Sequence, residues 1–156
     1  MCIEERLKNK NIILPPFNNA VANYSPAVKT QSLIFTAGQT PRYNGELKYK
    51  GKLNNQNIKK GMEAARLCVL NCLSIIKEYA GGLDNIVQIV KINGFVNSEA
   101  DFIHHAKVMN GATDLLVDIF GDIGRPARSS VGTNSLPGDA MVEVEMIVEI
   151  LESDQK

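Results

Sequence analysis

The chain ends in a run whose apolar and charged residues alternate almost strictly, and this run constrains the fold more than any other feature. Positions 141–150 read MVEVEMIVEI. Successive side chains of a β-strand point to opposite faces, so a strand over 141–151 would have one apolar face and one that carries glutamates. The apolar face has to be buried. The chain is therefore predicted to contain a sheet that other elements cover on one side.

Two amphipathic helices are predicted to supply that cover. Between Met62 and Ala80, apolar residues recur every three or four positions, which aligns them along one side of a helix. The glycine pair at 81–82 follows directly and is expected to end this helix. A second helix is predicted over about 100–120, and Gly121 is expected to end it.

The other expected strands are short and rich in β-branched residues. They are predicted over 27–30, 33–36, 86–96 and 127–133. The first two form a predicted hairpin around Gln31-Ser32, and Asn44-Gly45 predicts another tight turn. Residues 1–20 are expected to form an irregular lead-in that ends near Pro15 and Pro16, because proline interrupts regular structure.

This order of elements predicts an α+β fold in a single domain over residues 1–156. Two helices would pack on one face of a mixed sheet, which gives a two-layer arrangement. The second face of the sheet would stay uncovered in one chain. A homo-oligomer that brings these uncovered faces together is the expected way to bury it.

Composition excludes several classes of function. The 17 Lys and Arg residues balance the 17 Asp and Glu residues, and only 6% of the chain is aromatic. A nucleic-acid-binding protein usually shows a basic excess or aromatic stacking platforms, so no nucleic-acid partner is expected. No apolar run approaches the roughly 20 residues that span a bilayer, and the N-terminus does not resemble a signal peptide. No membrane contact is predicted, and the expected location is the cytoplasm.

Cysteine usage suits a reducing compartment. The chain has 3 cysteines, and Cys68 and Cys72 would lie one helical turn apart. Such a pair could bind a metal ion, but no further ligands lie at the spacing of a zinc site. Both residues fall in an apolar stretch, so burial in the core is the preferred interpretation.

Arg128 is the residue with the clearest chemical potential. A planar guanidinium binds a carboxylate through two parallel hydrogen bonds, and a nearby glutamate could position a water molecule. The strand over 127–133 is expected to fold back against the last strand. Arg128 could then instead form a structural ion pair with Glu143 or Glu145, and the glutamates could simply form a solvated outer face. The residues alone leave these alternatives open.

Several motifs together resemble the YjgF/RidA family, also called the endoribonuclease L-PSP family. Those that carry the resemblance are Pro126-Ala127-Arg128-Ser129, Leu136-Pro137, Val142-Glu143-Val144-Glu145, Ala37-Gly38-Gln39, Tyr24-Ser25-Pro26-Ala27-Val28, Val90-Lys91, Phe95-Val96 and Asp101-Phe102. The resemblance spans about 24–150, and its C-terminal part is the specific one. It implies a fold similar to the AroH-type chorismate mutase, assembled as a homotrimer with sites between subunits. It also implies hydrolysis of enamines and imines such as 2-aminoacrylate to 2-keto acids and ammonia, with no metal or organic cofactor.

The resemblance also implies roles for individual residues. Arg128 would bind the substrate carboxylate, and Glu143 would orient the attacking water or accept its proton. Tyr24 would close the cleft, and Gly38-Gln39 would shape its wall. Ser130 would line the substrate site at the position where many members carry a cysteine.

Departures from the family pattern keep other functions open. Gly132 and Asn134 replace bulkier residues, and the chain is longer than a typical member, so a distinct branch with its own substrate is indicated. A non-catalytic trimer that binds small carboxylate metabolites and has a regulatory role is the alternative function. Ribonuclease activity, which the family's second name suggests, is disfavoured by the neutral charge and the few aromatic residues.

Overall fold

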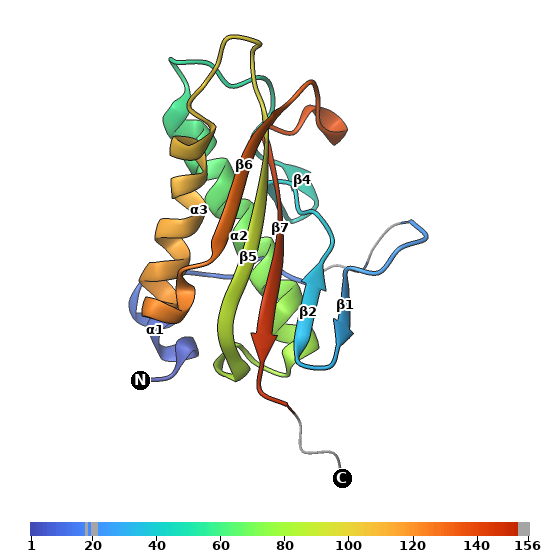
Figure 1. The fold of residues 1–156 in the computed structure, drawn as a ribbon, viewed down its shortest axis with the longest axis vertical. Coiled ribbons are helices and arrows are strands. Elements are labelled where there is room, and N and C mark those ends of the chain that lie inside the picture. The colour runs from blue at the N-terminus through green and yellow to red at the C-terminus, as the bar shows by residue number, and fades with distance from the viewer. Residues whose placement is uncertain (18, 20–21, 153–156) are drawn as a thin grey trace.

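The computed structural model describes residues 1–17, 19 and 22–152, and in these a single sheet lies against two long helices (Figure 1). The elements are α1 (Ile3–Asn9), β1 (Ala27–Thr30), β2 (Leu33–Thr36), β3 (Arg42–Tyr43), β4 (Glu46–Leu47), α2 (Ile58–Ala80), β5 (Ile86–Asn97), α3 (His105–Phe120), β6 (Ala127–Thr133) and β7 (Val142–Ile150). The main sheet has the strand order β1-β2-β7-β5-β6, and β3 and β4 form a separate hairpin. This arrangement confirms the predicted α+β fold.

The alternating C-terminal run occupies the middle of the sheet. β7 lies between β2 and β5 and is antiparallel to both. Its side chains alternate between buried and half-buried along the whole strand. The apolar set faces the helices, and Val142, Val144 and Val148 are completely buried. The sequence pattern therefore identified both the strand and its buried face.

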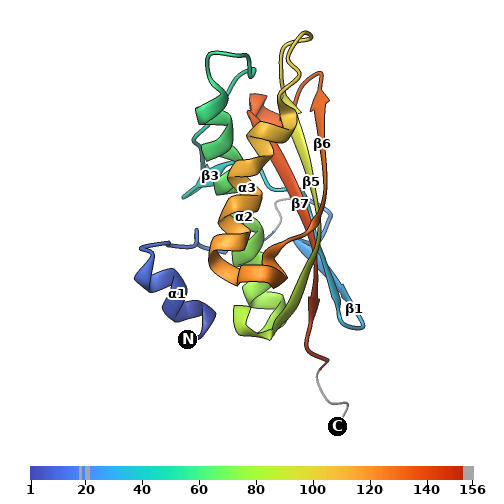
Figure 2. The same cartoon turned by 60° about the vertical axis from the view of Figure 1, so that its left-hand side comes forward.

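The helices α2 and α3 run along the same face of the sheet (Figure 2). Gly81 ends α2 in the left-handed conformation, with a φ of 71°, and its N–H donates to the Lys77 carbonyl. Helix α3 begins at His105, five residues later than predicted. The difference arises because Phe102 turns into the core, where it is 4% exposed and contacts the rings of both following histidines.

The expected irregular lead-in over residues 1–20 is wrong for its first part, because Ile3–Asn9 form an α-helix. The Cys2 sulfur accepts a hydrogen bond from the Glu5 N–H, and the Glu5 side chain accepts one from the Cys2 N–H, which together cap the helix start. Arg6 donates to the Ile119 carbonyl and so ties α1 to the end of α3. Residues 18 and 20 of the lead-in lie outside the described part of the chain.

The sequence suggested that β6 would fold back against β7, and this expectation is wrong. Strand β6 pairs in parallel with β5 and forms the edge of the sheet. Parallel neighbours need a crossover, and α3 supplies it between β5 and β6. This arrangement moves Arg128 away from the last strand.

The second face of the sheet is uncovered within the described chain, in agreement with the prediction. Large apolar side chains are exposed there: Val28 is 58%, Phe35 39% and Val131 47% exposed. Pairing across the strands aligns Val28 with Phe35 and Phe35 with Ile147 on this face. No helix in the described part of the chain has both the length and the hydropathy that a membrane crossing requires.

Candidate functional site

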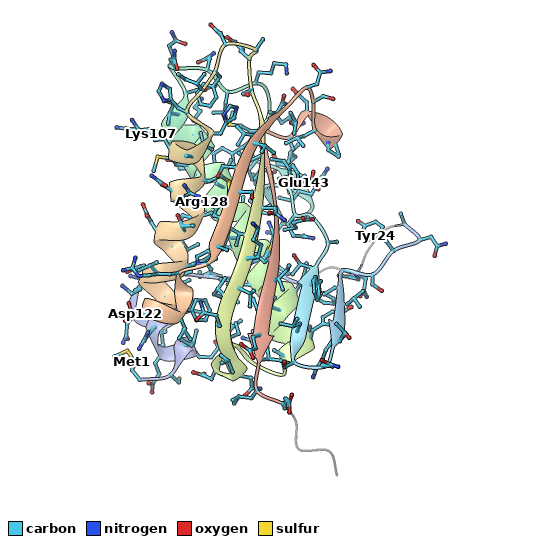
Figure 3. The ribbon with its side chains drawn as sticks, viewed as in Figure 1. Met1, Tyr24, Lys107, Asp122, Arg128 and Glu143 are labelled. Carbon is cyan, nitrogen blue, oxygen red and sulfur yellow. The ribbon has the colours of Figure 1, made fainter. Side chains whose placement is uncertain are left out.

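The predicted site residues fall into two regions of one chain (Figure 3). The Glu143 region consists of Glu143 on β7, Gly38-Gln39 beside it, and Tyr24 on the loop before β1. The Arg128 region consists of Arg128 and Ser130 on β6, which forms one edge of the sheet. The two regions differ in how their charged groups are held.

Backbone pairing fixes the Glu143 region. The Gln39 N–H donates to the Val144 carbonyl over 2.8 Å, and the Val144 N–H donates to the Gln39 carbonyl over 3.0 Å. This bridge continues the pairing of β2 with β7 and brings Gly38 against the Glu143 side chain. A Cβ atom at position 38 would overlap Oε1 of Glu143, so the carboxylate keeps its present position only beside a glycine.

Glu143 has the electrostatics of a proton acceptor. No described residue forms a hydrogen bond or an ion pair with its carboxylate. Partial burial raises the pKa of Glu143, and the neighbouring charge of Glu145 raises it further. Glu145 itself accepts a hydrogen bond of 2.8 Å from the Asn93 side chain. Of the two glutamates, Glu143 is therefore the one that is free to exchange a proton.

A cavity of about 630 Å³ lies next to this region. Tyr24, Gly38 and Gln39 all line it, so the structure brings three predicted site residues together. Arg42 lines it as well, and sequence reasoning missed this residue. Its only sequence signal was its place between the Ala37-Gly38-Gln39 motif and the Asn-Gly turn.

Neutral acceptors hold the guanidinium of Arg128. Its Nη1 donates to Asn110 Oδ1 over 2.8 Å and to Thr113 Oγ1 over 3.1 Å, both on α3. No carboxylate of the described chain lies within ion-pair distance of Arg128. The suggested ion pair with Glu143 or Glu145 is therefore wrong within one chain. The charge of Arg128 and its Nε–Nη2 edge remain free for a ligand.

Ser130 lies two positions along β6, on the same face as Arg128. Its Oγ is buried and has no hydrogen-bond partner among the described residues. Leaving a buried hydroxyl unpaired costs about 1–3 kcal/mol, so a ligand or a water molecule would satisfy a group that this chain leaves open. Position 130 is thus polar and unpaired, next to an uncompensated arginine.

One chain does not place Arg128 and Glu143 on the same ligand. Arg128 pairs with the buried Ile92 and therefore faces the helices. Glu143 pairs with Phe95 on the other side of the sheet, and β5 lies between their two strands. A ligand that contacts both groups needs them from different chains.

The two helical cysteines are core residues, as predicted. Cys68 and Cys72 are completely buried, and their thiols donate to carbonyls of β7. Burial raises the pKa of Cys72 to about 12 and raises that of Cys68 strongly as well. Both thiols therefore stay protonated, and neither supplies a reactive thiolate.

Comparison with known proteins gives a family match over most of the chain. Residues 4–150 match the model of a family described as YjgF/chorismate mutase-like, a description that also names an endoribonuclease. Protein TCP17 of Trypanosoma cruzi is 35% identical over 150 residues, which cover 95% of this chain and 94% of that protein.

Solved structures show the same fold. A Shewanella oneidensis protein superposes with a TM-score of 0.91 at 33% identity, and the match covers 96% of this chain and all of that one. The Escherichia coli YjgF gene product superposes with a TM-score of 0.65 at 27% identity, over 87% of this chain and 93% of that one.

Proposed function

Because the chain belongs to the YjgF/chorismate mutase-like family, we propose that it hydrolyses small enamines and 2-imino acids to 2-keto acids and ammonia. The observation that carries this proposal is the state of Glu143. Its carboxylate is half-buried, has a raised pKa and forms no hydrogen bond or ion pair with a described residue, and a side chain at position 38 would displace it. Such a group can take up a proton and return it within one reaction.

The reaction needs little beyond that proton transfer. An imine carbon is already electrophilic, so a water molecule held by Glu143 can attack it. The new C–O bond forms as the C=N electron pair moves to nitrogen, while Glu143 accepts a proton from the water and passes it to the nitrogen. The hydroxyl proton of the carbinolamine then moves through Glu143 to the nitrogen, and the C–N bond breaks to release ammonia and leave the keto group. In this proposal the rate enhancement comes from orienting the water and the substrate and from proton transfer, and no metal or organic cofactor takes part.

Arg128 would bind the substrate carboxylate through its free Nε–Nη2 edge. Since Arg128 and Glu143 face opposite sides of one sheet, the complete site would form between copies, with Glu143 from one chain and Arg128 from its neighbour. The exposed apolar side chains Val28, Phe35 and Val131 support an assembly that covers the bare face, and we propose a homotrimer. Tyr24 would close the cleft, and Ser130 Oγ would donate to the ligand.

An alternative is a non-catalytic trimer that binds small carboxylate metabolites and regulates another process. One observation favours it: asparagine and threonine side chains of α3 fix Arg128 independently of Glu143. Carboxylate binding would then persist without any proton transfer. The two functions share Arg128 and differ in what they require of Glu143.

The test is release of keto acid while an amino acid oxidase generates imino acids beside the purified protein. Wild type should accelerate release, whereas Glu143→Gln and Arg128→Ala should not. Under the deaminase proposal, Glu143→Gln still binds a carboxylate with an affinity within a few-fold of wild type. Binding by wild type with no acceleration across a panel of imino acids would support the alternative function.

A further inference from the structure

The cavity beside Gly38 has one charged lining residue among the described residues, Arg42. We propose that Arg42 binds a second anionic group of the ligand, so that the site prefers 2-imino acids and 2-keto acids with a carboxylate on the side chain. This inference rests on the proposed function, because it names the substrate class of the same site. Its carboxylate-binding part can be tested without turnover.

The fold holds Arg42 firmly at the cavity. Asn44 and Gly45 have φ values of 50° and 79°, which closes the β3–β4 hairpin in a tight turn. Arg42 Nη1 donates to the Gly45 carbonyl across this turn over 3.0 Å. Asn71 of α2 donates to the Arg42 carbonyl over 2.8 Å and so fixes the hairpin on the helix. The guanidinium therefore extends from an anchored backbone.

The charge of Arg42 has no partner in the described chain. The nearest acid along the hairpin, Glu46, forms an ion pair with Lys48 over 2.5 Å, and this contact lowers the pKa of Glu46. No described carboxylate lies within ion-pair distance of Arg42. Its Nε and Nη2 atoms have no hydrogen-bond acceptor in the described residues either, which leaves one edge free for two parallel bonds to a carboxylate.

The rest of the cavity suits the side chain of an acidic substrate. Neutral polar groups from Gln39 and Asn71 and apolar groups from Pro26 and Ile75 line it, together with Arg42. A single guanidinium among neutral groups attracts an anion more strongly than a neutral group of the same size. The cavity of about 630 Å³ also exceeds the needs of a three-carbon substrate.

Gly38 connects this cavity to the proposed reaction centre. Its backbone lines the cavity, and its missing Cβ leaves room for the Glu143 carboxylate. A ligand whose reacting carbon lies at Glu143 would therefore extend its side chain past Gly38 toward Arg42. A carboxylate at the end of that side chain would meet the guanidinium.

The experiment compares two stable ligands that differ in this carboxylate. Binding of 2-oxoglutarate and 2-oxobutanoate is measured by calorimetry for wild type, Arg42→Gln and the control Arg66→Gln, which removes an equal charge from an exposed position on α2 outside the cavity. Wild type should prefer 2-oxoglutarate about tenfold, and Arg42→Gln should lose that preference. Arg66→Gln should keep it.

Turnover of imino acids generated from glutamate and from alanine completes the test. A preference in binding that Arg42→Gln removes, without turnover by wild type, would overturn the deaminase but uphold Arg42 as a carboxylate-binding residue. Equal ratios for the two ligands in wild type and Arg42→Gln would overturn the proposal for Arg42, even if both proteins turn over imino acids. Failure of wild type to bind either ligand would overturn it as well.

Discussion

The Glu143 region and the Arg128 region each contain an ionisable group that has no counter-ion among the described residues, but the fold positions the two groups in opposite ways. Glu143 lies on the central strand, and its pKa is raised by burial and by a neighbouring carboxylate. Arg128 lies on an edge strand, and neutral oxygens from a helix hold it. The environment of Glu143 therefore suits proton transfer, and that of Arg128 holds a positive charge in place. Because Glu143 and Arg128 face opposite sides of one sheet, the carboxylate and the guanidinium of a single chain cannot contact the same ligand.

The largest expected effect comes from removing the proton acceptor. Glu143→Gln keeps the shape of the side chain but removes its basicity, and positioned acid–base groups contribute about 10²–10⁴-fold to rate. We expect keto acid release to fall by at least about 100-fold, while Kd for 2-oxobutanoate stays within a few-fold. A variant that retains half of its activity would show that Glu143 is not the proton acceptor.

Coexpression of two inactive variants tests whether Glu143 and Arg128 act from different chains. Glu143→Gln and Arg128→Ala are each expected to be inactive, yet coexpressed chains would form some sites with an intact Glu143 from one copy and an intact Arg128 from the other. Random assembly of equal amounts should restore about a quarter of wild-type activity, because half of the positions of each kind are intact. Coexpressed mixtures without any gain would show that both residues act within one chain, or that no shared site exists.

One of the uncharged acceptors that bind Arg128 can be replaced by a carboxylate, which would form an ion pair with it. Asn110→Asp places a carboxylate next to Nη1, where it would neutralise the guanidinium and compete with the ligand. We expect KM and the Kd for carboxylates to rise about tenfold, with kcat changed less and thermal stability unchanged or higher. Asn55→Asp, at an exposed position, is the control for the added charge. Unchanged binding in Asn110→Asp would show that the free charge of Arg128 has no role in it.

The local patterns that predicted most of the fold did not extend to pairings over long distances. Alternation revealed the buried face of β7, and a period of three to four revealed α2. Strand β6 was expected beside β7 because a short turn separates them, but the crossover through α3 places it next to β5. Helix α1 was missed because it has only 7 residues, too few for a clear helical period, and its cap is a cysteine, a residue outside the usual capping set.

The placement of the candidate site residues was predictable in part as well. Glu143, Gly38 and Gln39 were singled out by motifs that resemble those of the family, one on β7 and one just after β2, and the fold brings them together. The partners of Arg128 were missed because Asn110 and Thr113 lie on α3, where polar residues at these positions look like an ordinary helix surface. Only the packing of α3 against β6 gives them a role. Arg42 was missed for the same reason, since the hairpin that carries it is placed by contacts with α2.

A methyl group at Gly38 would disturb the Glu143 region but leave the Arg128 region intact. Gly38→Ala puts a Cβ where Oε1 of Glu143 now lies, so the carboxylate must move. We expect kcat to fall about tenfold, while the free energy of unfolding falls by no more than about 1 kcal/mol, because only the end of a flexible side chain has to shift. Gly132→Ala on β6, where the added Cβ would displace the His105 side chain instead of Glu143, is the matched control for kcat. Equal kcat in Gly38→Ala and wild type would show that the carboxylate position is not important.

The smallest effect is a pH dependence of stability that originates in the Glu143 region. Because folding raises the pKa of Glu143, this residue favours the folded state below its unfolded pKa and loses that contribution as the pH rises through the folded value. Glu143→Gln has no such loss, so above this range it should melt roughly 1–3 °C higher than wild type. The gap should close at pH 4. Melting curves between pH 4 and 8 measure it, and Arg128→Ala should show no gap that opens over this range. A gap independent of pH would mean that the substitution acts through packing, and that the carboxylate of Glu143 is solvated like any surface acid.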